Sequence, residues 1–157
     1  LPFEEEMQVL GLTTTTHVAQ AQTVTNAQEI LDMQQLVRMV PVAESVAKYA
    51  VAIVRATRPT DPSAPEIVKK YLNFGASVRG IQNIILAAKA RALMTGALHV
   101  QPSHLQDVAL PVLRHRIVTN FNAEADGVTS ETIVRTLLES TPLDAAAEGR
   151  PLDRLVT

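Results

Sequence analysis

Apolar side chains recur every three or four residues through the middle of the chain, which is the spacing of one face of an α-helix. The clearest stretch is 77–95, in which one face carries Ile81, Ile84, Ile85, Ala88 and Ala92. The stretch 41–55 carries Val42, Val46, Tyr49, Ala50, Ile53 and Val54 at the same spacing. Because such a stripe is stable only when it is buried, the pattern predicts two helices that face a core.

Four further helices are predicted from their start and stop signals. Their expected bounds are 3–10, about 26–40, 66–72 and 102–109. Gly11 should stop the first, and a capping box of Thr25 with Gln28 should begin the second, which Pro41 should end. Pro102 suits the first position of the last of these helices, because that position needs no backbone N–H.

The C-terminal third predicts one more amphipathic helix. Pro111 should end the preceding helix, or start a new turn that carries 112–116. A loop is expected over 122–128, and either Thr129 or Ser130 can cap the helix that follows. Its inward face is expected to consist of Ile133, Val134, Leu137 and Leu138.

Three segments lack helical spacing. The segment 58–65 has three prolines and is predicted to be a loop, and 142–157 is predicted to be a tail. The polar, threonine-rich segment 13–22 is predicted to be a loop or a short extended segment. The expected fold class is therefore all-α, a helical bundle with one polar segment near the N-terminus.

Composition narrows the classes of function. The chain has 157 residues, of which 46% are hydrophobic but only 3% aromatic, so the core must be aliphatic. The absence of cysteine excludes disulfides and thiol catalysis and fits a reducing compartment, for which we expect the cytoplasm. The formal net charge of -2 provides no basic field for nucleic acid or an anionic membrane. No apolar run reaches the length of a membrane span, and the acidic start does not resemble a signal peptide.

Familiar catalytic motifs are absent. The six glycines are spaced too widely for a phosphate-binding loop. His99 and His104 are five residues apart, a poor spacing for two metal ligands on one helix, so a surface or capping role is the favoured interpretation and no metal site is expected. Ser77 directly precedes a predicted helix, and capping explains it better than nucleophilic catalysis.

Two basic positions remain as candidate sites. Arg79 lies in the first turn of its helix, where the helix dipole disfavours a cation unless an anion comes close. A helix N-terminus is itself suited to binding phosphate. Arg114, His115 and Arg116 follow an apolar helical segment, so they either compensate the dipole at its C-terminal end or form a second anion or subunit contact. The sequence leaves these two interpretations open.

Taken in order, several motifs resemble those of the MoxR-type AAA+ ATPases. The family's G-A-S-P-R segment, its Y-V-T-P-x-D-V helix start, its V-L-R-H-R motif and the segment after that motif are similar to 75–79, 99–105, 112–116 and 124–131. The stretch 37–58, which ends in Arg55-Ala56-Thr57-Arg58, is also similar to the paired helices that precede these motifs. The resemblance covers about 3–138. Two departures are Val78, where the family has proline, and Gln101, where it has threonine.

The resemblance implies that 26–141 forms the helical lid of such an ATPase. The segment 1–25 would then be an acidic helix and linker from an ATPase core, and 142–157 a flexible tail. Arg79 would be the sensor 2 arginine, which binds the nucleotide phosphates together with Ser77. The complete protein would use ATP and Mg²⁺, and this region alone would not be catalytic.

The family also implies partners. These are the protein's own AAA+ core, neighbouring subunits in a homo-oligomeric ring, and a von Willebrand factor A domain protein. Two other functions stay open from the residues: a stand-alone helical adaptor that binds a peptide in an apolar groove, and a small nucleic-acid-binding domain that uses Arg114 and Arg116. The net charge argues against the second.

Overall fold

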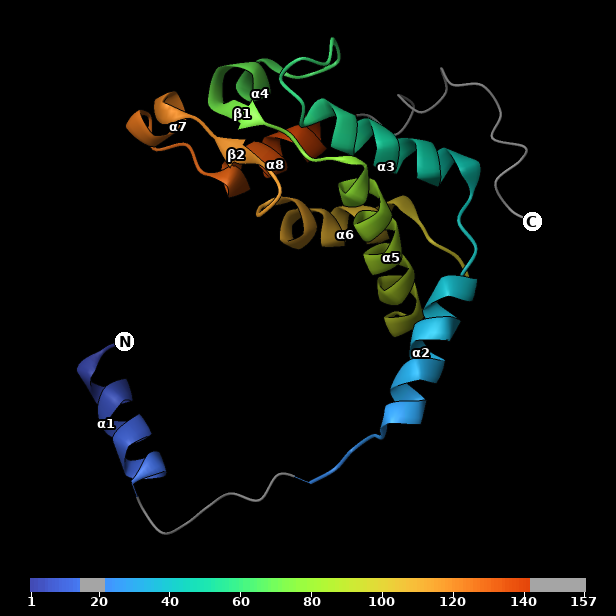
Figure 1. Cartoon of the computed structure of the whole chain (residues 1–157), viewed down its shortest axis with the longest axis vertical. Coiled ribbons are helices and arrows are strands. Elements are labelled where there is room, and N and C mark those ends of the chain that lie inside the picture. Colours follow the sequence, from blue (N-terminus) through green and yellow to red (C-terminus); the bar gives the residue numbers. More distant parts are fainter. Residues whose placement is uncertain (15–21, 142–157) are drawn as a thin grey trace. The chain divides into compact units, whose positions relative to one another are not determined.

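The computed structural model describes residues 1–14 and 22–141, which form helices and one short sheet (Figure 1). The elements are α1 (Phe3–Thr13), α2 (Ala27–Met39), α3 (Glu44–Ala56), α4 (Glu66–Tyr71), β1 (Leu72–Phe74), α5 (Val78–Met94), α6 (Pro102–Leu113), β2 (Val118–Thr119), α7 (Phe121–Ala125) and α8 (Ser130–Ser140). The all-α class is confirmed. The chain divides into two compact units, residues 1–33 and the remainder from Gln34.

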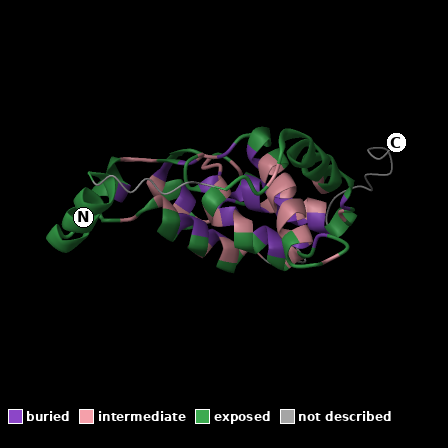
Figure 2. Ribbon diagram, turned by 90° about the horizontal axis from the view of Figure 1, so that it is seen from below, coloured by how far each residue is buried: buried purple, intermediate pink, exposed green. Residues whose placement is uncertain are grey.

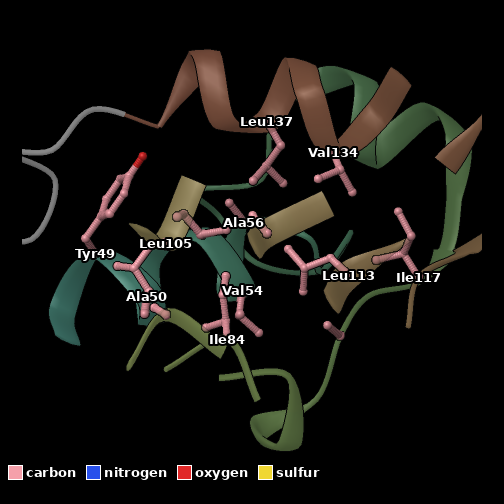
Figure 3. Packing of buried hydrophobic residues seen from close by; sticks show 14 of the residues in the cluster. Tyr49, Ala50, Val54, Ala56, Ile84, Leu105, Leu113, Ile117, Val134 and Leu137 are labelled. Carbon is pink, nitrogen blue, oxygen red and sulfur yellow. The ribbon is translucent and has the colours of Figure 1, made fainter. Parts of the chain in front are cut away.

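The second unit has an aliphatic core to which α3, α5, α6 and α8 contribute (Figures 2 and 3). Its fully buried side chains include Tyr49, Ile53, Ile84, Leu105, Leu113, Ile133 and Leu137. Burying one such side chain contributes about 1.5–3 kcal/mol to stability. The inward faces predicted for the 41–55, 77–95 and C-terminal helices are confirmed in their main members.

Helices α5 and α6 form a hairpin, and backbone hydrogen bonds to other segments hold each of its ends. At the connecting end, α5 ends at Met94 and Thr95 is its C-cap. Gly96 follows with φ of 74°, a conformation that glycine adopts readily, as predicted for the helix stop. The N–H of Val100 donates to the carbonyl oxygen of Pro41 at 3.1 Å, and Val100 forms a parallel bridge with Val42.

At the other end, β1 leads into α5 and β2 follows α6. The two strands pair antiparallel, with Leu72 opposite Thr119 and Phe74 opposite Val118, and the register is irregular between these pairs. With only three and two residues, these strands are too short to show an alternating pattern in the sequence. The sheet was therefore not predicted.

Four local predictions are wrong. Helix α1 continues past Gly11 to Thr13, because an exposed glycine costs a helix only about 1 kcal/mol. The N-terminal cap of α2 is Asn26 with Glu29, one residue beyond Thr25 and Gln28: Asn26 Oδ1 accepts from the N–H of Glu29 at 3.0 Å, and Glu29 Oε2 accepts from the N–H of Asn26 at 3.3 Å.

The other two errors concern α6 and α7. Pro111 lies inside α6, which continues to Leu113. The φ of proline suits a helix, and the burial of Ala109 and Leu113 on either side of it offsets the lost backbone hydrogen bond. The short helix α7 occupies part of the predicted loop 122–128, and Asn120 caps it by accepting from the N–H of Ala123 at 3.1 Å.

The predicted division into 1–25, 26–141 and 142–157 stays a prediction. The tail 142–157 and most of the polar segment 13–22 lie outside the described residues. Among the residues that the structure describes, no helix is both long and apolar enough to cross a membrane.

Candidate functional site

The start of α5 is the part of the fold that carries Ser77 and Arg79. Ser77 takes the extended N-cap conformation (φ −84°, ψ 179°) and the helix begins at Val78, as predicted and without the proline of the family motif. Its hydroxyl, however, makes no capping hydrogen bond. The N–H that it would accept belongs to Gly80, and this N–H donates instead to the carbonyl oxygen of Ser77 at 2.8 Å. The Ser77 hydroxyl is thus not used by the helix.

Arg79 is exposed in the first turn of α5. That turn has no acidic residue. Within 1–14 and 22–141, the Arg79 guanidinium has neither a hydrogen bond nor an ion pair. An unpaired cation at the positive end of a helix dipole costs a few tenths of a kcal/mol, and an anion brought to this turn would remove that cost.

The segment before α5 is held by the C-terminal end of α3. The N–H of Ala76 donates to Thr57 Oγ1 at 2.9 Å, and the carbonyl oxygen of Ala76 accepts from Arg58 Nε at 3.0 Å. Gly75 lies so close to this end of α3 that a Cβ on it would be 2.3 Å from the carbonyl oxygen of Thr57. The chain therefore enters α5 along a path fixed by three neighbouring contacts.

The end of α6 carries Arg114, His115 and Arg116. Arg116 Nη1 donates to the carbonyl oxygen of Val112 at 2.6 Å and also contacts His115 Nε2. The contact with Val112 places the Arg116 charge at the negative end of the helix dipole. This agrees with the interpretation that these basic residues compensate the dipole. Arg114 is the exposed C-cap residue, and its guanidinium has no partner within the described part of the chain.

The structure brings the start of α5 and the end of α6 together. A Cβ on Gly80 would be 3.8 Å from Leu113 Cδ2 and 3.6 Å from Val54 Cγ1, so α5, α6 and α3 meet there. Arg79 precedes Gly80 and Arg114 follows Leu113 directly. Two unpaired guanidinium groups are thus attached next to one junction of three helices.

Several other charged groups of the second unit are already paired. Arg55 bridges Asp61, and Arg91 bridges Asp107, each with an N–O distance of 2.9 Å. Hydrogen bonds from the Ser63 hydroxyl and N–H, followed by the Arg55 contact, lower the pKa of Asp61 to about 2. The Asp61 carboxylate is therefore ionised near neutral pH, and both aspartates are engaged in ion pairs.

Two lysines also have partners. Lys89 Nζ donates to the carbonyl oxygen of Arg38 at 2.8 Å, and burial, followed by the nearby Arg38 charge, lowers the pKa of Lys89. Lys70 Nζ contacts the hydroxyl of Tyr71 and Asp126 Oδ2, which together raise the pKa of Lys70.

His104 has a capping role, which confirms the favoured interpretation for this residue. It is buried, its Nδ1 accepts from the N–H of Gln101 at 3.1 Å, and its Nε2 lies 3.2 Å from Thr95 Oγ1. In the described ranges, no group of three or more histidine or acidic side chains is placed to hold a metal ion.

Thr57 and Arg58 are the residues of this region that reasoning from single residues did not identify. Nothing in the apolar spacing distinguishes a buried threonine from an exposed one. The only available signal was the similarity of 55–58 to a family segment, which gave no role for either side chain.

Comparisons with known proteins give one matching family model and two curated relatives. Residues 64–137 match the family described as the AAA lid domain. Chaperone MoxR1 of Mycobacterium tuberculosis is 32% identical over 124 residues, which cover 79% of this chain and 33% of that protein. The uncharacterized protein YeaC of Bacillus subtilis is 30% identical over 139 residues, covering 88% of this chain and 41% of YeaC.

A solved structure adds a similarity in three dimensions. A candidate ATPase from Cytophaga hutchinsonii superposes with a TM-score of 0.77 and 30% sequence identity, over 90% of this chain and 43% of that one. The chain thus spans between a third and about two fifths of the length of the curated relatives that it matches.

Proposed function

This chain belongs to the MoxR-type AAA+ ATPases and forms their helical lid, and we propose that in the complete protein it contributes Arg79 to the binding and hydrolysis of ATP. Arg79 would act as the sensor 2 arginine and bind the nucleotide phosphates from the lid side. The observation that carries the proposal is an unpaired guanidinium in the first turn of a helix whose start is fixed by α3.

The residues at the start of α5 fit a phosphate group. Guanidinium is always charged and can donate two parallel hydrogen bonds to phosphate oxygens. The first N–H groups of a helix also lack intrahelical partners and face an incoming anion. We propose that the Ser77 hydroxyl, which does not cap the helix, is a second polar contact to the same group. Among the residues that the structure describes, neither side chain has an interaction that it would have to break to bind.

Arg79 would act on the reaction by electrostatic stabilisation. ATP supplies the phosphoryl group, and Mg²⁺ neutralises part of its charge when bound. The charge that develops during transfer would lie against a guanidinium whose helix start is held by α3, so the backbone that carries Arg79 need not move to meet it. The described residues provide no cluster of metal ligands, so we propose that the rest of the protein holds Mg²⁺. The same arginine would close the lid over bound nucleotide.

Arg114, His115 and Arg116 are proposed to divide their tasks. Arg116, with His115 beside it, stays on the end of α6, where it contacts Val112. Arg114 is free to contact a second anion or a neighbouring subunit. Its place next to Leu113, which meets the start of α5, supports an involvement in the same region as Arg79.

The partners proposed for the complete protein follow from the family. They are its own AAA+ core, identical subunits in a ring and a von Willebrand factor A domain protein as client or co-factor of a chaperone-like activity in the cytoplasm. The relative named Chaperone MoxR1 supports the chaperone-like part of this proposal.

The test is an Arg79→Ala variant of the complete protein. We expect the ATPase rate at saturating ATP to fall about 10- to 100-fold, because the loss of one preorganised donor to a developing charge typically costs that much or more. A weaker ATP affinity should accompany it. The matched control is Arg91→Ala, which removes an arginine from the other end of the same helix and should leave both quantities near wild type. Unchanged ATP affinity and ATPase rate in Arg79→Ala would refute the proposal.

A further inference from the structure

Thr57 and Arg58 contact the same residue, Ala76, from the end of α3. One accepts its N–H and the other donates to its carbonyl oxygen, at 2.9 and 3.0 Å. Ala76 lies three residues before Arg79 and is itself buried. Both polar backbone groups of one residue are therefore held by consecutive residues of another helix end, 18 and 19 positions earlier in the chain.

The Thr57 hydroxyl is suited to this role by its own surroundings. It is buried, with 1% of its surface exposed. Its proton is directed to the carbonyl oxygen of Val54 at 2.6 Å, which leaves an oxygen lone pair for the N–H of Ala76. Because one hydroxyl satisfies both partners, the position of Ala76 is tied to the last turn of α3 rather than to a mobile side chain.

Arg58 makes the second contact with Ala76, a hydrogen bond from its guanidinium group to the carbonyl oxygen. Its Nε donates to Ala76 while the side chain is half-buried, so the guanidinium is held at its inner nitrogen. Gly75 completes the fit, because only a residue without Cβ can approach the Thr57 carbonyl oxygen this closely. A displacement of any of these contacts would move the start of α5 and the base of the Arg79 side chain with it.

We propose that Thr57 and Arg58 are positioning residues for Arg79, which set where its guanidinium meets the nucleotide phosphates. This inference rests on the proposed function of Arg79. Catalytic rates are sensitive to such placement, since an error of about 1 Å can cost on the order of a hundredfold. Thr57 and Arg58 act through the backbone of Ala76 and need not contact the nucleotide themselves.

The first test is Thr57→Val in the complete protein, which keeps the shape of the side chain and removes its hydroxyl. We expect kcat to fall about tenfold, with a smaller change in KM, because the phosphate contact is misplaced rather than removed. Thr57→Ser keeps the hydroxyl and should restore most of the rate. Thr95→Val removes a threonine hydroxyl from the opposite end of α5 and serves as the matched control, with kcat near wild type.

A double-mutant cycle separates positioning from general destabilisation. In an Arg79→Ala background, Thr57→Val should cause no further loss of kcat, because there is no longer a guanidinium to position. A tenfold loss in both backgrounds would overturn the inference, and so would an unchanged kcat in Thr57→Val alone. Assays are run well below the unfolding temperature of each variant.

Arg58→Lys keeps the inference testable should Thr57→Val not fold. Lysine preserves the charge but has no nitrogen at the Nε position, so the Ala76 tie is lost. We expect a loss of kcat of several fold that is again absent in the Arg79→Ala background. Arg55→Lys, one turn earlier and bridged to Asp61, is its control. A change in ATPase rate on Arg79→Ala together with full activity in Arg58→Lys and Thr57→Val would refute the positioning role alone, whereas an unaffected Arg79→Ala would refute the proposed function.

Discussion

Replacing Gly75 by alanine should destabilise the second unit more than its small size suggests. The new Cβ would lie 2.3 Å from the carbonyl oxygen of Thr57, 2.6 Å from its carbonyl carbon and 2.7 Å from Arg58 Cα. All three are backbone atoms, so no side chain can rotate away. Ordinary contact begins at about 3.4 Å, and the difference of 3.4 − 2.3 Å requires a movement of about 1 Å.

The expected loss of stability follows from the hydrogen bonds that such a movement would break. The movement would lengthen the bond from the N–H of Ala76 to Thr57 Oγ1 from 2.9 Å to nearly 4 Å, beyond hydrogen-bond reach, and would weaken the bond from Arg58. Losing a buried bond of the first kind costs about 1–3 kcal/mol, and the charged one adds a similar or smaller amount. We expect a total of about 2–4 kcal/mol, partly offset by the lower entropy of alanine in the unfolded chain.

The assay is unfolding of the chain by urea and by heat, monitored by circular dichroism. A loss of about 2–4 kcal/mol corresponds to a thermal midpoint roughly 4–16 °C lower for a protein of this size. Gly127→Ala is the control. Gly127 has φ of 68°, and no heavy atom lies within 4 Å of the position that a Cβ would take, so only a conformational cost of about 1 kcal/mol is expected. Equal midpoints for Gly75→Ala and Gly127→Ala would refute the steric reasoning.

Two further predictions concern other contacts. His104→Phe should lower the free energy of unfolding in urea by about 0.5–2 kcal/mol, because it leaves the partly buried N–H of Gln101 without its side-chain acceptor. A loss equal to that of the exposed control His99→Phe would contradict the capping role. The Asp61 pKa is lowered from 3.8 to about 2, so its ionised form adds stability above about pH 4 that is lost as the pH falls toward 2. Asp61→Asn should therefore be less stable than wild type at pH 5 but nearly equal at pH 2, and a stability difference that does not change with pH would argue against the pairing.

Much of the helical framework could be predicted because its signals are local. The stripe from Ile81 to Ala92 and the positive-φ stop at Gly96 each depend on residues within a few positions of one another. The first turn that contains Arg79 was found by the same reasoning, from Ser77 onward. Errors of one residue, as at Asn26, arise where neighbouring polar residues can each serve as the cap.

The features that remained hidden depend on distant parts of the chain. Thr57 meets Ala76 only because α3 and α5 pack together, and no local pattern marks that contact. The β1–β2 pair joins segments about 45 residues apart through very few hydrogen bonds. The candidate cation was therefore predictable, whereas the contacts that hold the start of its helix were not.

Tying the α5–α6 hairpin at both ends has a mechanical consequence. The link from Val100 to Pro41 holds the connecting end, and the β1–β2 ladder holds the other. The ends of the two helices next to the sheet cannot separate without breaking the β1–β2 ladder, and the loop that connects them cannot leave the start of α3 without breaking the link to Pro41. The hairpin should therefore move as one rigid unit, and we expect any hinge to lie in the chain segments that flank it. In hydrogen exchange, the amides of α5 and α6 should open together, and later than those of α1, in which no residue is buried.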